Sequence, residues 1–208
     1  MENSFRMSLF MPPISPIKDK ATGRIVKNAT LTPLRTVELS EVYKLVTANT
    51  KLTALTLAVR SAVQQGDDSV CRLLKQQTLP YVTPCGVFTR RRSDCIEETS
   101  GLVVVDVDHL ESNEEAKQLR QLLFDDPYLC PALVFVSPTG QGVKAFVPCA
   151  IGQSATDGIR WAMNYVHCMY DTDHRNSGKG VDTSGKDLVR SCFLCHDPGA
   201  LIRITNGE

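Results

Sequence analysis

Apolar residues recur at helical spacing through residues 37–77, in three groups that each fit one face of an α-helix. Gly66 and the two aspartates after it separate the second group from the third, and an aspartate there can cap the helix that follows. We therefore expect a layer of helices packed on a sheet. The preceding residues, 1–35, hold four prolines and only a short alternation at 24–27. They predict an arm with one or two edge strands.

The second half of the chain alternates short apolar runs with helical patterns. In order, we expect a buried strand (101–107), a helix opened by the capping-box pattern at 112–115 and stopped before Pro127, two strands joined by a tight turn (132–136 and 143–147), a helix (about 154–170), a polar loop (171–186) and a strand (188–194). This order predicts an α+β domain with helices on one face of the sheet.

Composition places the chain among ordinary globular proteins. It has 208 residues, of which 42% are hydrophobic and 22% charged, with a formal net charge of +0. A neutral balance disfavours a strongly basic protein that coats DNA, because phosphate affinity comes largely from Lys and Arg. No apolar run approaches the ~20 residues that span a bilayer, and the first residues do not predict a signal peptide. We expect a cytoplasmic protein with no membrane partner, whose eight cysteines are reduced.

The apolar run at 101–107 leads into two carboxylates, Asp106 and Asp108. Side chains two apart in a strand point the same way, with Cα atoms ~6.6 Å apart. At an effective dielectric constant of ~20 the two charges repel by roughly 2.5 kcal/mol. A divalent cation would offset that cost, and oxygen ligands suit Mg²⁺ or Mn²⁺. The alternative is that both are solvated turn residues or caps, and the neighbouring His109 fits a surface position.

Two other stretches carry groups that suit phosphate. The turn at 137–142 holds Gly140 and Gly142 and is followed by Lys144. Glycines let backbone N–H groups approach phosphate oxygens, and a lysine adds a charge, although a plain β-hairpin loop explains the glycines equally well. The stretch at 181–190 offers Asp182, Lys186 and Arg190, with a polar loop as its alternative.

Two local patterns suggest sites that their context disfavours. Residues 180–186 fit a phosphate-binding loop up to Lys186, but Asp187 replaces the required Ser or Thr and a strand-like run follows. Cys192 and Cys195 have the spacing of a haem or zinc pair, yet they lie on an apolar run. We interpret them as two buried thiols, with zinc binding as the alternative.

Four segments together resemble a known family: LPYVTPCGVF, SGLVVVDVDHL, DDPYLCPALVFVSPTGQGVKAFVP and VDTSGKDLVRSCFLCHDP. They look like the domain found N-terminal to virulence-associated E (VirE) type proteins of Bacteroidetes mobile elements, which is itself similar to the archaeo-eukaryotic primase superfamily. The resemblance runs from about residue 35 to 200. It implies an arm at 1–35 and a primase-like domain at 36–208, made of an N-terminal helical or α+β unit (about 36–100) and an RRM-like antiparallel or mixed sheet (about 101–208).

The resemblance also implies roles for the residues singled out above. Asp106, Asp108 and Asp182 match the catalytic acids that hold two metals, although Asp187 remains a rival to Asp182 as third ligand. The implied nucleotide-binding positions are Ser137, Gly140, Gly142, Lys144, Lys186 and Arg190. Lys144 stands where the family has a histidine, and a lysine lacks the planar, titratable imidazole.

The function expected from these matches is that of a primase-polymerase-like nucleotidyltransferase in the replication of a mobile element. Its cofactor would be Mg²⁺ or Mn²⁺. Its substrates would be a nucleoside triphosphate and single-stranded or primed DNA, and a helicase module is an expected partner. The alternative is a catalytically weak or inactive module that binds DNA or nucleotide and recruits a helicase, which Lys144 and the neutral net charge favour.

Overall fold

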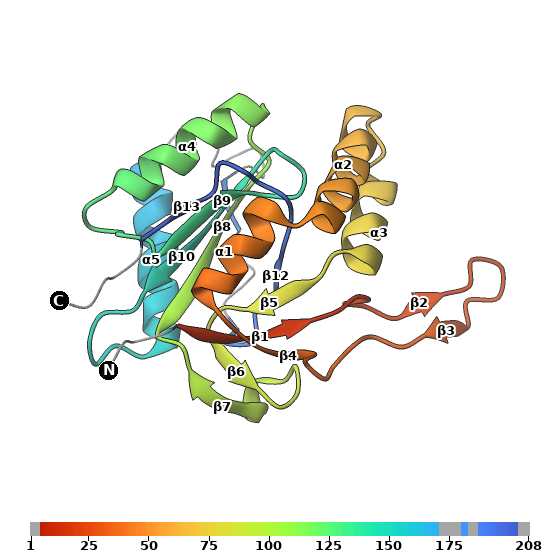
Figure 1. The fold of residues 1–208 in the computed structure, drawn as a ribbon, viewed down its shortest axis with the longest axis horizontal. Coiled ribbons are helices and arrows are strands. Elements are labelled where there is room, and N and C mark those ends of the chain that lie inside the picture. Colours follow the sequence, from red (N-terminus) through yellow and green to blue (C-terminus); the bar gives the residue numbers. More distant parts are fainter. Residues whose placement is uncertain (1–4, 171–179, 183–186, 204–208) are drawn as a thin grey trace.

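The computed structural model describes residues 5–170, 180–182 and 187–203 (Figure 1). Its larger sheet has the order β11-β8-β10-β9-β13, and all its neighbours are antiparallel. The strands are β8 (Leu102–Asp108), β9 (Leu133–Val136), β10 (Val143–Pro148), β11 (Gly180–Val181) and β13 (Leu201–Ile202). These assignments confirm the α+β class.

Two helices connect these strands in the order β-α-β-β-α-β, which corresponds to the predicted RRM-like unit. They are α4 (Asn113–Asp125) and α5 (Ala155–Tyr170), both close to the predicted ranges. Helix α4 begins where the capping pattern predicted, because the Ser112 side chain accepts a hydrogen bond from the Glu115 N–H at 3.1 Å. One face of the sheet packs on these helices through Val103, Val105 and Val107.

A second sheet and three helices form the N-terminal part. The sheet has the order β12-β5-β1-β4, with β1 (Arg6–Phe10), β4 (Arg35–Glu38), β5 (Tyr81–Thr83) and β12 (Cys192–Phe193). The helices are α1 (Leu39–Ala48), α2 (Thr50–Gln64) and α3 (Asp68–Thr78), and they confirm the three helical patterns. A smaller hairpin pairs β6 (Gly86–Phe88) with β7 (Ile96–Thr99), with a 3₁₀ turn at Ser93–Cys95.

The N-terminal arm differs from the prediction. Strand β1 lies between β4 and β5 with Met7 and Phe10 fully buried, so it is an inner strand and not an edge strand. The short apolar run of β1 does not predict this inner position, because its strand partners β4 and β5 come later in the chain. Only the ribbon of β2 (Ile17–Lys18) and β3 (Ile25–Lys27) projects as an arm (Figure 1).

The strand predicted at 188–194 is also different. Only Cys192 and Phe193 are in strand conformation, and they pair with β5 of the N-terminal sheet. The Phe193 ring packs edge-on against Tyr81 with 6.1 Å between ring centroids. Because β13 then returns to the larger sheet, the chain crosses between the two units instead of dividing cleanly near residue 100.

The second face of the larger sheet is also covered by helices, α1 and α2. The prediction that helices cover only one face is therefore only partly correct. Val104, Phe135 and Phe146 from this face share one apolar core with Val42 of α1 and Val59 of α2. Side chains at even positions of β8 therefore point into the junction between the two units, which is where Asp106 lies. Within the described ranges, no helix combines the length and apolar character needed to cross a bilayer.

Candidate functional site

Three carboxylates meet at the end of β8. Asp106 and Asp108 lie two positions apart on this strand, so both point toward the junction of the two units. Asp182 directly follows β11, and its N–H donates to the carbonyl of Asp106 at 2.8 Å. One oxygen from each of the three carboxylates lies within 4.8 Å of the others. Asp187, the rival third ligand, is exposed and outside this group.

Two cations neutralise part of this charge. Lys144 on β10 is directly opposite Asp106 in the register, is only 5% exposed, and forms an ion pair with the Asp106 carboxylate. Arg190 donates to Asp182 at 2.6 Å and lies 3.5 Å from Asp106. Both predicted cations therefore contact the acids, whereas Lys186 lies outside the described residues.

Burial and charge set the protonation states in this cluster. Burial alone would lower the pKa of Lys144, but the charges of Asp106 and Asp108 outweigh it and raise that pKa well above the usual lysine value. The pKa of Asp108 is raised, first by burial and then by repulsion from Asp106, while Lys144 and Lys75 act in the opposite direction. Lys144 therefore stays protonated at neutral pH, and added positive charge would favour the ionised form of Asp108.

The turn at 137–142 lies close to these acids, and this close approach requires glycine. Gly142 has no room for a side chain, since a Cβ there would lie 2.4 Å from the Val107 carbonyl oxygen and 3.2 Å from an Asp108 carboxylate oxygen. Gly140 has φ +79°, which favours glycine. Two turn N–H groups are already bonded within the turn: Ser137 to the Gly142 carbonyl at 2.8 Å, and Gly140 to the Ser137 carbonyl at 2.9 Å. Phosphate binding by Ser137, Gly140 and Gly142 therefore stays a prediction.

The donor set fits a divalent ion. Oδ1 of Asp106 is buried and has no hydrogen-bond partner among the residues that the structure describes, although the other oxygen of this carboxylate is paired with Lys144. A buried carboxylate oxygen without a donor is costly, and a cation would relieve that cost. Among the described residues, Lys144 and Arg190 are the cations that form ion pairs with these carboxylates. Hard oxygen ligands suit Mg²⁺ or Mn²⁺.

Comparison with known proteins places this cluster in a family. The model of the BT4734-like, N-terminal domain matches residues 74–201. The chain belongs to this family. No curated protein and no solved structure gives a significant match. The matched range holds all three carboxylates and both cations that contact them, so the cluster lies wholly inside the BT4734-like domain.

A pocket of about 200 Å³ opens beside the cluster, lined by Asp108 and by residues of α3. The cations of this pocket, Arg72 and Lys75, were not among the predicted site residues, because the prediction for this helix used only its apolar face. Arg72 and Lys75 are three residues apart, so the sequence alone places both on one face of the helix. Only the fold shows that this face lies opposite the turn at 137–142. Lys75 is inside the BT4734-like match, and Arg72 lies just before it.

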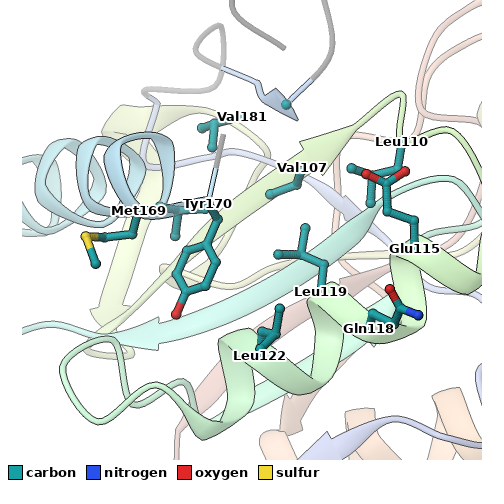
Figure 2. Close-up of a pocket in the computed structure, with 11 residues that line it drawn as sticks. Val107, Leu110, Glu115, Gln118, Leu119, Leu122, Met169, Tyr170 and Val181 are labelled. Carbon is teal, nitrogen blue, oxygen red and sulfur yellow. The ribbon is translucent and has the colours of Figure 1, made fainter. Parts of the chain in front are cut away.

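A larger pocket, of about 270 Å³, lies on the opposite face of the sheet (Figure 2). Val107 points into it, whereas its strand neighbours Asp106 and Asp108 point the other way. Leu119 and Leu122 of α4 and Tyr170 of α5 form much of its lining. It adjoins the strands that carry the acids of the BT4734-like domain, because Val107 lies between Asp106 and Asp108 on β8 and Val181 directly precedes Asp182.

Proposed function

We propose that this chain is a metal-dependent nucleotidyltransferase domain of the primase-polymerase type that acts in the replication of a mobile element. The observation that carries the proposal is the convergence of Asp106, Asp108 and Asp182, brought from segments more than 70 residues apart to within 4.8 Å. The resemblance of the four segments to VirE-type N-terminal domains and to archaeo-eukaryotic primases supports it. The substrates are a nucleoside triphosphate and single-stranded or primed DNA.

The three carboxylates would hold two divalent ions, Mg²⁺ or Mn²⁺. Such ions would lower the pKa of the attacking 3′-hydroxyl and neutralise the leaving pyrophosphate. The raised pKa of Lys144 keeps this side chain protonated, so its role is electrostatic and not that of a base. Lys144 orients Asp106, and Arg190 orients Asp182, through the ion pairs described above. In this proposal the same two cations would also stabilise negative charge that develops on the reacting phosphoryl group.

The alternative proposal is a catalytically weak or inactive module that binds DNA or nucleotide and recruits a helicase. The ion pair of Lys144 with Asp106 favours it, since one carboxylate oxygen that a metal would use already has a cationic partner. A histidine at this position could release its proton near neutral pH, whereas this buried lysine does not.

Synthesis on defined templates tests the proposal. The purified chain is incubated with primed and unprimed single-stranded DNA, labelled nucleotides and Mg²⁺ or Mn²⁺. We expect extension products that fall more than about 100-fold in Asp108→Asn, because even residues behind a metal ligand commonly matter 10- to 100-fold. Asp187→Asn is the matched control, since Asp187 is an exposed aspartate five positions after Asp182 and is outside the cluster.

Folding must be separated from chemistry in this assay. Thermal unfolding and far-UV circular dichroism are recorded for each variant before activity is compared. No product from the folded wild type, with DNA binding retained, selects the binding-module alternative. Equal product from wild type and a folded Asp108→Asn variant rejects the metal-dependent enzyme.

A further inference from the structure

The pocket beside the acidic cluster joins three separate elements. Helix α3 supplies Arg72 and Lys75, the end of β8 supplies Asp108, and the turn at 137–142 supplies Thr139 and Gln141. One wall is therefore cationic and another carries the acid that would hold a metal. The remaining charged group is Asp68, one turn before Arg72 on α3, and His109 also borders the pocket.

The cations of this pocket form no ion pair within the described chain, although the charge of Lys75 acts on Asp108. Arg72 is exposed and Lys75 is half-buried, and neither side chain makes a hydrogen bond or ion pair within the described residues. A third cation, Arg60 of α2, lies beside the same turn, 3.4 Å from where a Cβ on Gly140 would be. Its Nε is buried and lacks a hydrogen-bond partner in the described part of the structure. Lys144 and Arg190, in contrast, are already paired with the carboxylates.

Unpaired cations next to a candidate metal site suit one ligand class. A phosphate chain offers several oxygens that accept from guanidinium and ammonium groups, and it can also bind the metal held by an adjacent carboxylate. Arg72 and Lys75 are balanced by Asp68 and Asp108 when no metal is bound. A divalent ion at Asp108 would make the pocket net positive, so phosphate binding should depend on the metal.

We infer that this pocket holds the phosphate chain of a metal-complexed nucleoside triphosphate, with Arg72 and Lys75 of α3 as its direct contacts. The inference rests on the proposed function, and it places the substrate's phosphates against the N-terminal helical layer. The two units of the fold would thus both contribute to the nucleotide site, one with the acids and the other with these cations.

Equilibrium binding tests the inference on the full chain. Fluorescently labelled ATP is titrated with wild type in Mg²⁺ and in EDTA, and then displaced with inorganic tripolyphosphate, adenosine or single-stranded DNA. We expect binding in Mg²⁺ that tripolyphosphate displaces and adenosine does not. The variant Arg72→Gln/Lys75→Gln should bind at least about tenfold more weakly, because it loses two charge-assisted contacts.

Two further variants make the test specific. Lys44→Gln/Lys51→Gln removes two exposed lysines from α1 and α2, away from the pocket, and should bind within about twofold of wild type. Asp68→Asn removes the opposing charge within the pocket and should bind about two- to threefold more tightly. A change in the same direction for all three variants would indicate a general charge effect and would overturn the inference.

The outcomes separate the inference from the proposed function. Equal affinity of wild type and the Arg72/Lys75 variant, no nucleotide binding at all, or displacement by DNA but not by tripolyphosphate would each overturn the inference. If affinity depends on Arg72 and Lys75 but the wild type makes no product, the inference stands and the enzyme proposal fails. If wild type extends primers and the double variant keeps its KM for nucleotide, the enzyme proposal stands and the inference fails.

Discussion

Two groups of buried charges in this chain differ in how completely they are paired. Asp197 forms an ion pair with Arg120 at 3.0 Å, and its carboxylate also accepts from the N–H groups of Val136 at 2.7 Å and Gly199 at 3.1 Å. Every oxygen of this carboxylate therefore has a donor. In the cluster of Asp106, Asp108 and Asp182, Oδ1 of Asp106 has no donor within the described part of the chain.

The first group is a fully paired structural ion pair, whereas the second has the incomplete pairing expected of the proposed metal site. Asp197 links α4 to β9 and to the segment after β12, and it gains nothing from an added cation. The acidic cluster borders a pocket, and one of its buried carboxylate oxygens has no hydrogen-bond donor among the described residues. Removing a partner should destabilise the first group under all conditions. The second group should respond chiefly to divalent ions.

The largest effect is expected at the structural pair. Asp197→Ala leaves Arg120 mostly buried without its counter-charge, which should reduce the free energy of unfolding by about 3–5 kcal/mol. Urea denaturation measures the loss. Glu114→Ala breaks the exposed pair with Lys117 and should cost at most about 1 kcal/mol. A similar small loss for both variants would remove the contrast between buried and exposed pairs.

The next effect concerns the response to metal. At 100 times its dissociation constant, a divalent ion should raise the free energy of unfolding of wild type by about 2.7 kcal/mol. Asp182→Asn should lose most of this stabilisation, and Asp187→Asn should keep it. Thermal unfolding in Mg²⁺ or Mn²⁺ and in EDTA measures the shift. An unchanged shift in Asp182→Asn would mean that Asp182 is not a ligand.

A third variant tests how closely the turn is fitted to the acids. Gly142→Ala forces a Cβ against the Val107 carbonyl and should cost about 1–3 kcal/mol of stability. Because the same Cβ approaches Asp108, divalent binding should also weaken. Gly152→Ala is the control, since it meets no atom within 4 Å but has φ +79° and therefore reports backbone strain alone. Weakened metal binding in both variants would contradict a local effect of Gly142.

An effect of similar size is expected at Asp126, a buried carboxylate that has donors but no cationic partner among the described residues. Burial opposes its ionisation, but hydrogen bonds from the N–H groups of Leu129 and Tyr128 and from the hydroxyls of Tyr170 and Tyr165 outweigh burial and lower its pKa. Its stabilisation is therefore complete above the usual aspartate pKa of about 3.9 and is lost as the pH falls through the lower folded value. Asp126→Asn should cost about 1–3 kcal/mol at pH 7 and less near pH 3, as measured by urea denaturation. An equal cost at both pH values would contradict the assigned pKa.

The elements that the sequence predicted best are those with local signals. The helices α1 to α5 and the strands β8, β9 and β10 follow from periodicity, capping and turn residues that lie within a few positions of one another. The acids were found for the same reason, since Asp106 and Asp108 end one apolar run. The inner position of β1 and the crossing of β12 were not predicted, because their strand partners lie far along the chain and no local pattern specifies the pairing.

The sequence by itself determined which residues are acidic, where the strand that carries two of them ends, and that glycines form the neighbouring turn. The tertiary structure alone decided that Asp182, and not Asp187, joins them, because hydrogen bonding between Asp182 and the backbone of Asp106 fixes the register of β11 on β8. It also decided the roles of the cations. The antiparallel register sets Lys144 directly opposite Asp106, and helix packing places Arg72 and Lys75 around the adjoining pocket. Charge pairing depends on distance in space, and no local pattern of the chain specifies that distance.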